Sequence, residues 1–148
     1  MPERSFRILL WTLALVGVGL DQGTKYGMFS WLKNQPEHTR QVFRFEQGAA
    51  FQLQARHQFN AATGENEPQV NSGALFGWLG DYKDLANNGF AVVSLLAALA
   101  IIYWSFRATT ARDRWLCIAL GLILAGTVGN LFDRAVFGGV RDFLDFYW

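Results

Sequence analysis

The chain has 148 residues, of which 51% are hydrophobic and 16% aromatic, a composition more apolar than that of an ordinary soluble domain. The formal net charge is +1 and no long run of like charge occurs, which argues against nucleic acid and against a strongly acidic partner. The single cysteine, Cys117, excludes an internal disulfide, and its position inside an apolar run predicts a packing role. We expect one domain over residues 1–148.

Three apolar stretches predict an α-helical integral membrane protein with three transmembrane helices. They are Ile8 to Leu20, Phe90 to Phe106 and Trp115 to Phe132, and the last two approach, as helices, a hydrocarbon thickness of roughly 30 Å. Asp21 interrupts the first stretch, but apolar residues continue to Leu32, so this helix is expected to reach an interfacial end. A cleavable secretory signal is the alternative, but Asp-Gln-Gly-Thr-Lys stands where small residues would mark a cleavage site.

Basic residues predict the orientation of these helices. Five arginines flank them: Arg4, Arg7, Arg107, Arg112 and Arg114. The first two precede the first helix, and the other three lie in the short loop between the second and the third. Because basic loops favour the cytoplasmic side, residues 30–88 and the tail after Phe132 are expected on the periplasmic or extracellular side.

The outer segment, residues 30–88, is expected to form a small β-containing unit. Thr39 to Leu53 interleaves aromatic and polar residues as in a short strand, whereas Gln54 to Gln69 is polar and is expected to be a loop. Ala74 to Leu79 is short, apolar and aromatic, which suits the membrane surface. Packing beneath the loop is the open alternative for this last part.

Two clusters of polar residues stand in or beside the predicted membrane helices. A charged group at membrane depth costs on the order of 3 kcal/mol, so such groups usually face the protein interior and have a function. In the first cluster, Asp21 and Lys25 are four residues apart and can pair along one helix face. A snorkelling pair at a helix end is the alternative.

The second cluster, residues 129–134, closes the third helix with the sequence Gly-Asn-Leu-Phe-Asp-Arg. Asn130 and Asp133 are about one turn apart and share a helix face. A glycine pair at 138–139 permits a tight turn, which would bring Asp142 and its neighbours back onto the helices. Alone, this cluster is also compatible with an ordinary helix end that carries interfacial charges.

Most catalytic motifs find no support in the sequence. There is no serine elbow, no zinc-type His-Glu-x-x-His and no phosphate loop, and both histidines, His38 and His57, lie in the polar outer segment. We therefore expect no metal site. What remains is carboxylate chemistry, in which two nearby acids share a proton, one activating water while the other protonates the leaving group.

Read in order, four short motifs resemble the signature of signal peptidase II: Asp21-Gln22-x-Thr24-Lys25, Asn71-x-Gly73-Ala74-x-Phe76, Gly129-Asn130-x-x-Asp133-Arg134 and Val140-x-Asp142-Phe143. Each motif alone is weak, but together they span nearly the whole chain. The resemblance implies a multi-pass aspartic endopeptidase of the bacterial inner membrane, with four transmembrane helices and a site facing the periplasm. Such an enzyme contacts membrane lipids, requires no cofactor and removes the signal peptide from prolipoproteins, cutting before the cysteine that carries diacylglycerol. We expect a monomer.

The same resemblance assigns roles to individual residues. Asp142 is one member of the catalytic dyad, and Asp133 is a supporting residue and the second candidate for a catalytic role. Six further positions match those that bind substrate or shape the site: Asp21, Lys25, Asn71, Gly73, Asn130 and Arg134.

The chain departs from the family pattern in two places. The second dyad aspartate belongs to a Phe-Asn-x-Ala-Asp motif at the start of the fourth helix, and the chain reaches Trp148 without it. We expect a C-terminally truncated chain, inactive alone; Asp145 is a weaker substitute. Residues 55–70 resemble an insertion before the Asn71 motif, unless that motif is displaced from Gln47.

Two other functions stay open at this stage. One is a non-catalytic membrane homologue that keeps the scaffold without the dyad, and the other is a small structural membrane protein with coincidental motifs. If the enzyme interpretation holds, the aromatic segment with Phe76 and Trp78 is expected to cover the site, and replacing both should impair substrate handling more than folding.

Overall fold

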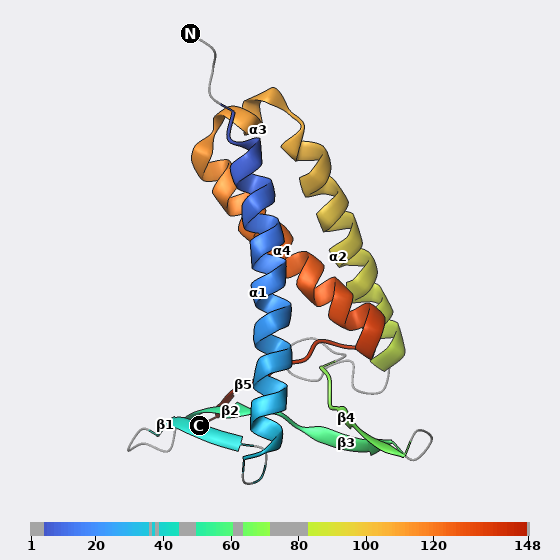
Figure 1. Cartoon of the computed structure of the whole chain (residues 1–148). Coiled ribbons are helices and arrows are strands. Elements are labelled where there is room, and N and C mark those ends of the chain that lie inside the picture. The colour runs from blue at the N-terminus through green and yellow to red at the C-terminus, as the bar shows by residue number, and fades with distance from the viewer. Residues whose placement is uncertain are drawn as a thin grey trace.

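The computed structural model describes residues 5–35, 37, 39–44, 50–60, 64–71 and 83–147. Its elements, in chain order, are α1 (Arg7–Lys33), β1 (Thr39–Arg44), β2 (Ala50–Gln54), β3 (His57–Asn60), β4 (Glu65–Pro68), α2 (Lys83–Ser105), α3 (Ala108–Arg112), α4 (Arg114–Phe137) and β5 (Leu144–Tyr147). The helices form an elongated bundle, with α3 at one end and the strands at the other (Figure 1). Gln47, Gly73, Phe76 and Trp78 lie outside the described residues.

The long helices cover the three predicted apolar stretches and extend beyond them. α4 begins after Asp113, whose carboxylate accepts a hydrogen bond of 3.0 Å from the main-chain nitrogen of Leu116. It continues past Phe132 to Phe137 because the polar residues that follow find partners inside the bundle. Gly138, at φ 73°, ends the helix in the left-handed conformation that glycine adopts without strain.

Small residues set the crossing of α1 and α4. A Cβ atom at Gly121 would stand 2.7 Å from the main-chain oxygen of Leu10, and one at Gly17 would stand 2.5 Å from the Cβ of Ala125. The two helices therefore approach closely where they cross (Figure 1). Around the crossing lies an apolar core shared with α2, formed by Leu10, Ala14, Ala98, Ile101, Cys117, Leu120 and Leu124. Cys117 is fully buried there, as the sequence predicts.

Among the described residues, two helices are long and apolar enough to cross a membrane: α2 over Asp84–Ser105 and α4 over Arg114–Phe137. Each leaves large apolar side chains uncovered, among them Leu96 and Leu99 on α2 and Leu122 on α4. Such uncovered apolar surface suits contact with lipid tails rather than water. These helices match two of the three predicted membrane spans.

Four of the five arginines that predict the orientation, those at 7, 107, 112 and 114, lie at the end of the bundle away from the strands, here called the basic end; the fifth, Arg4, lies outside the described residues. Arg7, at the start of α1, donates a hydrogen bond of 3.0 Å from Nε to the main-chain oxygen of Ser105 at the end of α2. At the same end, Arg107 precedes the short helix α3, Arg112 is its last residue and Arg114 begins α4 (Figure 1). The sheet lies at the opposite end, where the outer segment was expected.

The predicted extended segment forms two strands of an antiparallel sheet with the order β1-β2-β5. β1 pairs with β2 in a register that shifts between Gln41 and Phe43, and β2 pairs with β5. The side chains of Phe29, Leu32 and Ala55 form a buried apolar cluster where α1 meets the sheet, with Phe143 packed against it. The sheet is thereby fixed to the end of α1.

The prediction of a loop over Gln54 to Gln69 is wrong for most of this segment. β3 and β4 pair as an antiparallel hairpin, and the main-chain nitrogen of Gln69 donates to the oxygen of Arg56 at 2.8 Å. Gly64, at φ 72°, adopts a left-handed conformation beside the turn. The hairpin satisfies main-chain groups of a polar sequence that lacks the alternation of a half-buried strand.

Candidate active site

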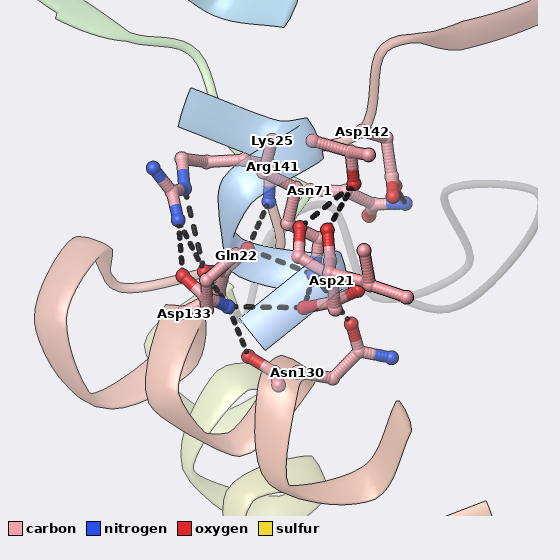
Figure 2. A network of polar contacts seen from close by, with 11 residues as sticks. Asp21, Gln22, Lys25, Asn71, Asn130, Asp133, Arg141 and Asp142 are labelled. Atoms are coloured by element: carbon pink, nitrogen blue, oxygen red, sulfur yellow. Dashed lines mark hydrogen bonds and ion pairs between the residues drawn. The ribbon is translucent and has the colours of Figure 1, made fainter. Parts of the chain in front are cut away.

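The polar residues of α1 and α4 meet at the end of the bundle that is nearer the sheet. Lys25 is buried and its Nζ lies 2.9 Å from Oδ2 of Asp21, 3.0 Å from Oδ1 of Asn130 and 3.2 Å from Oδ2 of Asp133. Figure 2 shows these side chains converging from the two helices. Asp21 and Lys25 therefore pair as their spacing predicts, and both motifs contribute to one cluster.

Gln22 completes the contact between the two helices. Its Nε2 donates to the main-chain oxygen of Gly129 at 3.1 Å, to Oδ1 of Asp133 at 3.2 Å and to Oδ2 of Asp21 at 3.0 Å. Gln22 belongs to the first motif, but its place in the sequence predicted no role for it. Its only signal was its place beside Asp21, because one glutamine at a helix position does not reveal which neighbour it faces.

Asp133 is fully buried and holds Arg141, a residue that sequence reasoning missed. The NH2 nitrogen of Arg141 lies 2.8 Å from Oδ1 of Asp133 (Figure 2). Because Arg141 occupies the unspecified position of the Val-x-Asp-Phe motif, the resemblance gave no signal for it. Asp133 therefore stands between two cations, Lys25 and Arg141, and these contacts fit a supporting role.

The glycine pair turns the chain back onto the bundle, as predicted. After Gly138 ends α4, Gly139 packs so close to Asn71 that a Cβ atom there would stand 3.0 Å from its main-chain carbon. Val140 and Asn71 then exchange main-chain hydrogen bonds of 2.8 and 2.9 Å. The turn thus brings Asn71, the first residue of its motif, beside Asp142.

Asp142 is exposed, and its Oδ2 accepts a hydrogen bond of 3.1 Å from Nδ2 of Asn71. It lines two cavities. One, of about 280 Å³, lies against the polar cluster and includes Lys25 and Asn130. The other, of about 340 Å³, extends toward the strands and is lined also by Arg56. Asp142 is thus an accessible carboxylate with an oriented oxygen beside two open spaces.

Arg134 is not among the residues that line either cavity. Its NH1 donates to Oδ1 of Asn87 at 3.3 Å, and its guanidinium lies 4.9 Å from the ring centre of Phe90. Both partners belong to α2. Arg134 therefore connects α4 to α2, whereas Asp133 faces α1.

Asp145 lies on β5 and accepts a hydrogen bond of 2.8 Å from Nε2 of Gln52 on the neighbouring strand. Gly73, the remaining predicted site residue, lies outside the described residues. Within the described ranges, no group of three or more His, Cys, Asp or Glu residues is arranged to hold a metal ion.

Curated relatives match this chain over different lengths. The lipoprotein signal peptidase of Aeromonas hydrophila is 44% identical over 78 residues, which cover 53% of this chain and 46% of that protein. The lipoprotein signal peptidase of Rhodopirellula baltica is 36% identical over 147 residues, which cover 92% of this chain and 57% of that protein. The chain spans about half the length of these relatives. No solved structure matches it.

The family described as signal peptidase (SPase) II matches residues 13–148. This match takes in all four motifs and nearly the whole chain. The chain therefore belongs to the signal peptidase II family of membrane-bound aspartic peptidases.

Proposed function

We propose that the complete protein is an aspartic endopeptidase of the bacterial inner membrane, which removes the signal peptide from diacylglyceryl-modified prolipoproteins and cuts before the lipid-modified cysteine. The observation that carries this proposal is the exposed carboxylate of Asp142, oriented by Asn71 beside a buried cluster of paired charges. Membership of the signal peptidase II family supports the reaction class.

In this proposal α1 crosses the membrane together with α2 and α4. The apolar half of α1 leaves Leu15 and Leu20 exposed, as suits contact with lipid. The charged residues between its two ends, Asp21 and Lys25, are paired with each other and with α4, which lowers the cost of placing them near the membrane. The sheet and Asp142 then lie on the periplasmic side, because the basic end faces the cytoplasm.

The proposed chemistry uses Asp142 and a second aspartate that share one proton. One carboxylate takes a proton from water as the water oxygen attacks the carbonyl carbon of the scissile peptide. The C–N bond then breaks while the other aspartate gives its proton to the departing nitrogen. We propose that the second aspartate comes from the Phe-Asn-x-Ala-Asp motif, in a segment that follows Trp148 in the complete protein.

The two cavities beside Asp142 suit a substrate with an apolar and a polar part. The cavity against α1 and α4 is the nearer to the proposed membrane and would receive the signal-peptide side of the scissile bond. The cavity toward the strands, lined by Arg56, Gln69 and Asp145, would receive polar residues that follow the cysteine. A site at the membrane surface also lets water reach a bond beside a lipid anchor.

The experiment uses the complete gene product in detergent and a diacylglyceryl-modified prolipoprotein peptide, with products identified by mass spectrometry. We expect cleavage before the modified cysteine and its loss in Asp142→Asn. Asp84→Asn, a matched change at an exposed position in the first turn of α2, should retain activity. Asp145→Asn tests Asp145 as the weaker substitute for the second dyad aspartate. If Asp145→Asn loses cleavage while Asp142→Asn retains it, the catalytic role belongs to Asp145.

A second candidate function is a non-catalytic homologue that binds prolipoproteins. It is favoured by one observation: within the described part of the chain, the aspartates near Asp142 are engaged elsewhere, Asp21 and Asp133 in ion pairs and Asp145 with Gln52. The same assay separates the two functions. Peptide binding without any cleavage by the complete protein would favour the homologue.

A further inference from the structure

Arg141 immediately precedes Asp142, and we propose that it is a positioning residue, which fixes the main chain from which the Asp142 side chain projects. This inference rests on the proposed function and adds a residue to it. Three kinds of contact carry it: side-chain and main-chain bonds to one carboxylate, contacts of the guanidinium with two aromatic rings, and the main-chain pairing of the residue before it.

The side chain of Arg141 is almost fully buried, with 2% of its surface exposed. Its NH2 and Nε nitrogens donate to Oδ1 of Asp133 at 2.8 and 3.3 Å, and NH2 also donates to Oε1 of Gln22 at 2.7 Å. The guanidinium is therefore held by α4 through Asp133 and by α1 through Gln22. A planar fork with several donors can make these bonds together, whereas an ammonium group cannot.

Two rings complete the surroundings of this guanidinium. Its central carbon lies 4.1 Å from the ring centre of Tyr26 on α1 and 4.1 Å from that of Phe137 at the end of α4. Both distances are within the range of a cation–π interaction. The rings also fill the space beside the fork, so a smaller side chain would leave a gap between α1 and the end of α4.

The main chain of Arg141 is attached to the same carboxylate as its side chain. Its main-chain nitrogen donates to Oδ2 of Asp133 at 3.1 Å, while the guanidinium binds Oδ1. Residue 140, one position earlier, is paired with the main chain of Asn71. The two residues that precede Asp142 are thus both fixed, and Asn71 binds the carboxylate itself.

In this arrangement Arg141 positions Asp142, whereas other residues provide most of the cavity wall that would bind the substrate. Arg141 is buried behind Asp142, and the cavity that it helps to line keeps other walls from α1 and α4, including Lys25 and Asn130. Loss of the guanidinium would leave the main chain before Asp142 held only by the bond from the Arg141 nitrogen to Asp133 and by the pairing of Val140 with Asn71, so this segment should loosen. Asp133 would keep Lys25 as its remaining ion pair in the cluster. We expect the catalytic rate to fall while the cavity walls, and hence substrate affinity, change little.

The test measures kcat and KM of the complete protein with the lipid-modified peptide, normalised to folded protein. Arg141→Gln is expected to lower kcat roughly 100-fold with KM within about twofold, because small misplacements of a reacting group cost rate rather than binding. Arg141→Lys keeps the charge and should recover part of the loss. Arg107→Gln, a matched change at the basic end of the bundle, should leave kcat unchanged. If Arg141→Gln fails to fold, Phe137→Leu removes one of the two rings beside the guanidinium while its hydrogen bonds stay in place, and it should lower kcat about tenfold.

A second readout does not depend on cleavage. Hydrogen exchange of the main-chain amides at 139–143 should speed up in Arg141→Gln, while exchange in the middle of α4 stays as in the wild type. Unchanged exchange, or a loss of kcat matched by an equal loss of peptide affinity in an Asp142→Asn background, would overturn the inference. Faster exchange in a protein that never cleaves would instead refute the proposed function and leave the positioning contact established.

Discussion

Gly129 lies against the side chain of Asp21, so close that a Cβ atom at position 129 would overlap the carboxylate. The main-chain oxygen of Gly129 also accepts a hydrogen bond from Gln22. One glycine on α4 therefore contacts two consecutive residues of α1, Asp21 and Gln22. The polar cluster depends on this close approach, because any side chain at position 129 would push Asp21 away from Lys25.

The first prediction concerns this glycine. Gly129→Ala should lower the free energy of unfolding by about 1–3 kcal/mol, as overpacking of a tight contact does. The measurement is thermal unfolding in detergent. Gly126→Ala is the matched control on the same helix, since the space around Gly126 is open; it should be neutral or stabilising by up to about 1 kcal/mol. Equal effects of the two changes would contradict the close contact.

A second prediction tests the hydrogen bond from Asn71 to Asp142. Asn71→Ala removes a bond to a charged group, worth about 1.5–3 kcal/mol, so kcat should fall roughly 10- to 100-fold. Because the side chain of Asn71 is exposed and its pairing with Val140 uses main-chain atoms, thermal stability should change by less than about 0.5 kcal/mol. Asn88→Ala, at an exposed position of α2, is the control. A parallel loss of stability and activity would point to a purely structural residue.

The third prediction concerns the buried cation of the cluster. Lys25→Met should destabilise the fold by about 3–5 kcal/mol, because Asp21 and Asp133 would lose the ammonium between them. Adding Asp21→Asn removes one of the uncompensated charges, so the double variant should lose less than the sum of the single losses. Unfolding of the four proteins in detergent gives this coupling. Arg40→Met, at an exposed position of β1, should stay within about 0.5 kcal/mol of the wild type, and strict additivity would rule out the cluster as described.

A fourth prediction addresses the cavity toward the strands. Arg56→Glu reverses a charge on its wall and should change KM up to about fivefold, in opposite directions for peptides with acidic and with basic residues after the cysteine. The effect should fade as salt is raised, since the side chain is exposed. Peptides that differ only in that one residue provide the comparison. Identical KM ratios in wild type and Arg56→Glu would place the mature segment elsewhere.

The local parts of the site could be predicted from the sequence, because helical spacing fixes which residues share a face. Asp21 with Lys25, and Asn130 with Asp133, follow from separations of four and three residues. Their meeting across two helices could not be derived in the same way. It depends on the crossing of α1 and α4, and periodicity does not say which helices are neighbours.

The strands show a second limit of prediction from the sequence. β3 and β4 are polar, and β5 was not predicted at all, because each is stabilised by pairing with a partner strand rather than by its own composition. Arg141 shows a third. Nothing in its spacing indicates whether an arginine at the end of a turn enters the bundle, and the burial of its charge depends on Asp133 and two rings from different helices.

The crossing of α1 and α4 has a mechanical consequence. The two helices touch closely at Gly17 and Gly121. The polar cluster lies on one side of this contact, in the C-terminal halves of α1 and α4. A larger side chain at either position would change the angle between the helices. The distance between Lys25 on α1 and Asp133 on α4 would then increase. The positions of the acids thus depend in part on two glycines that line neither cavity.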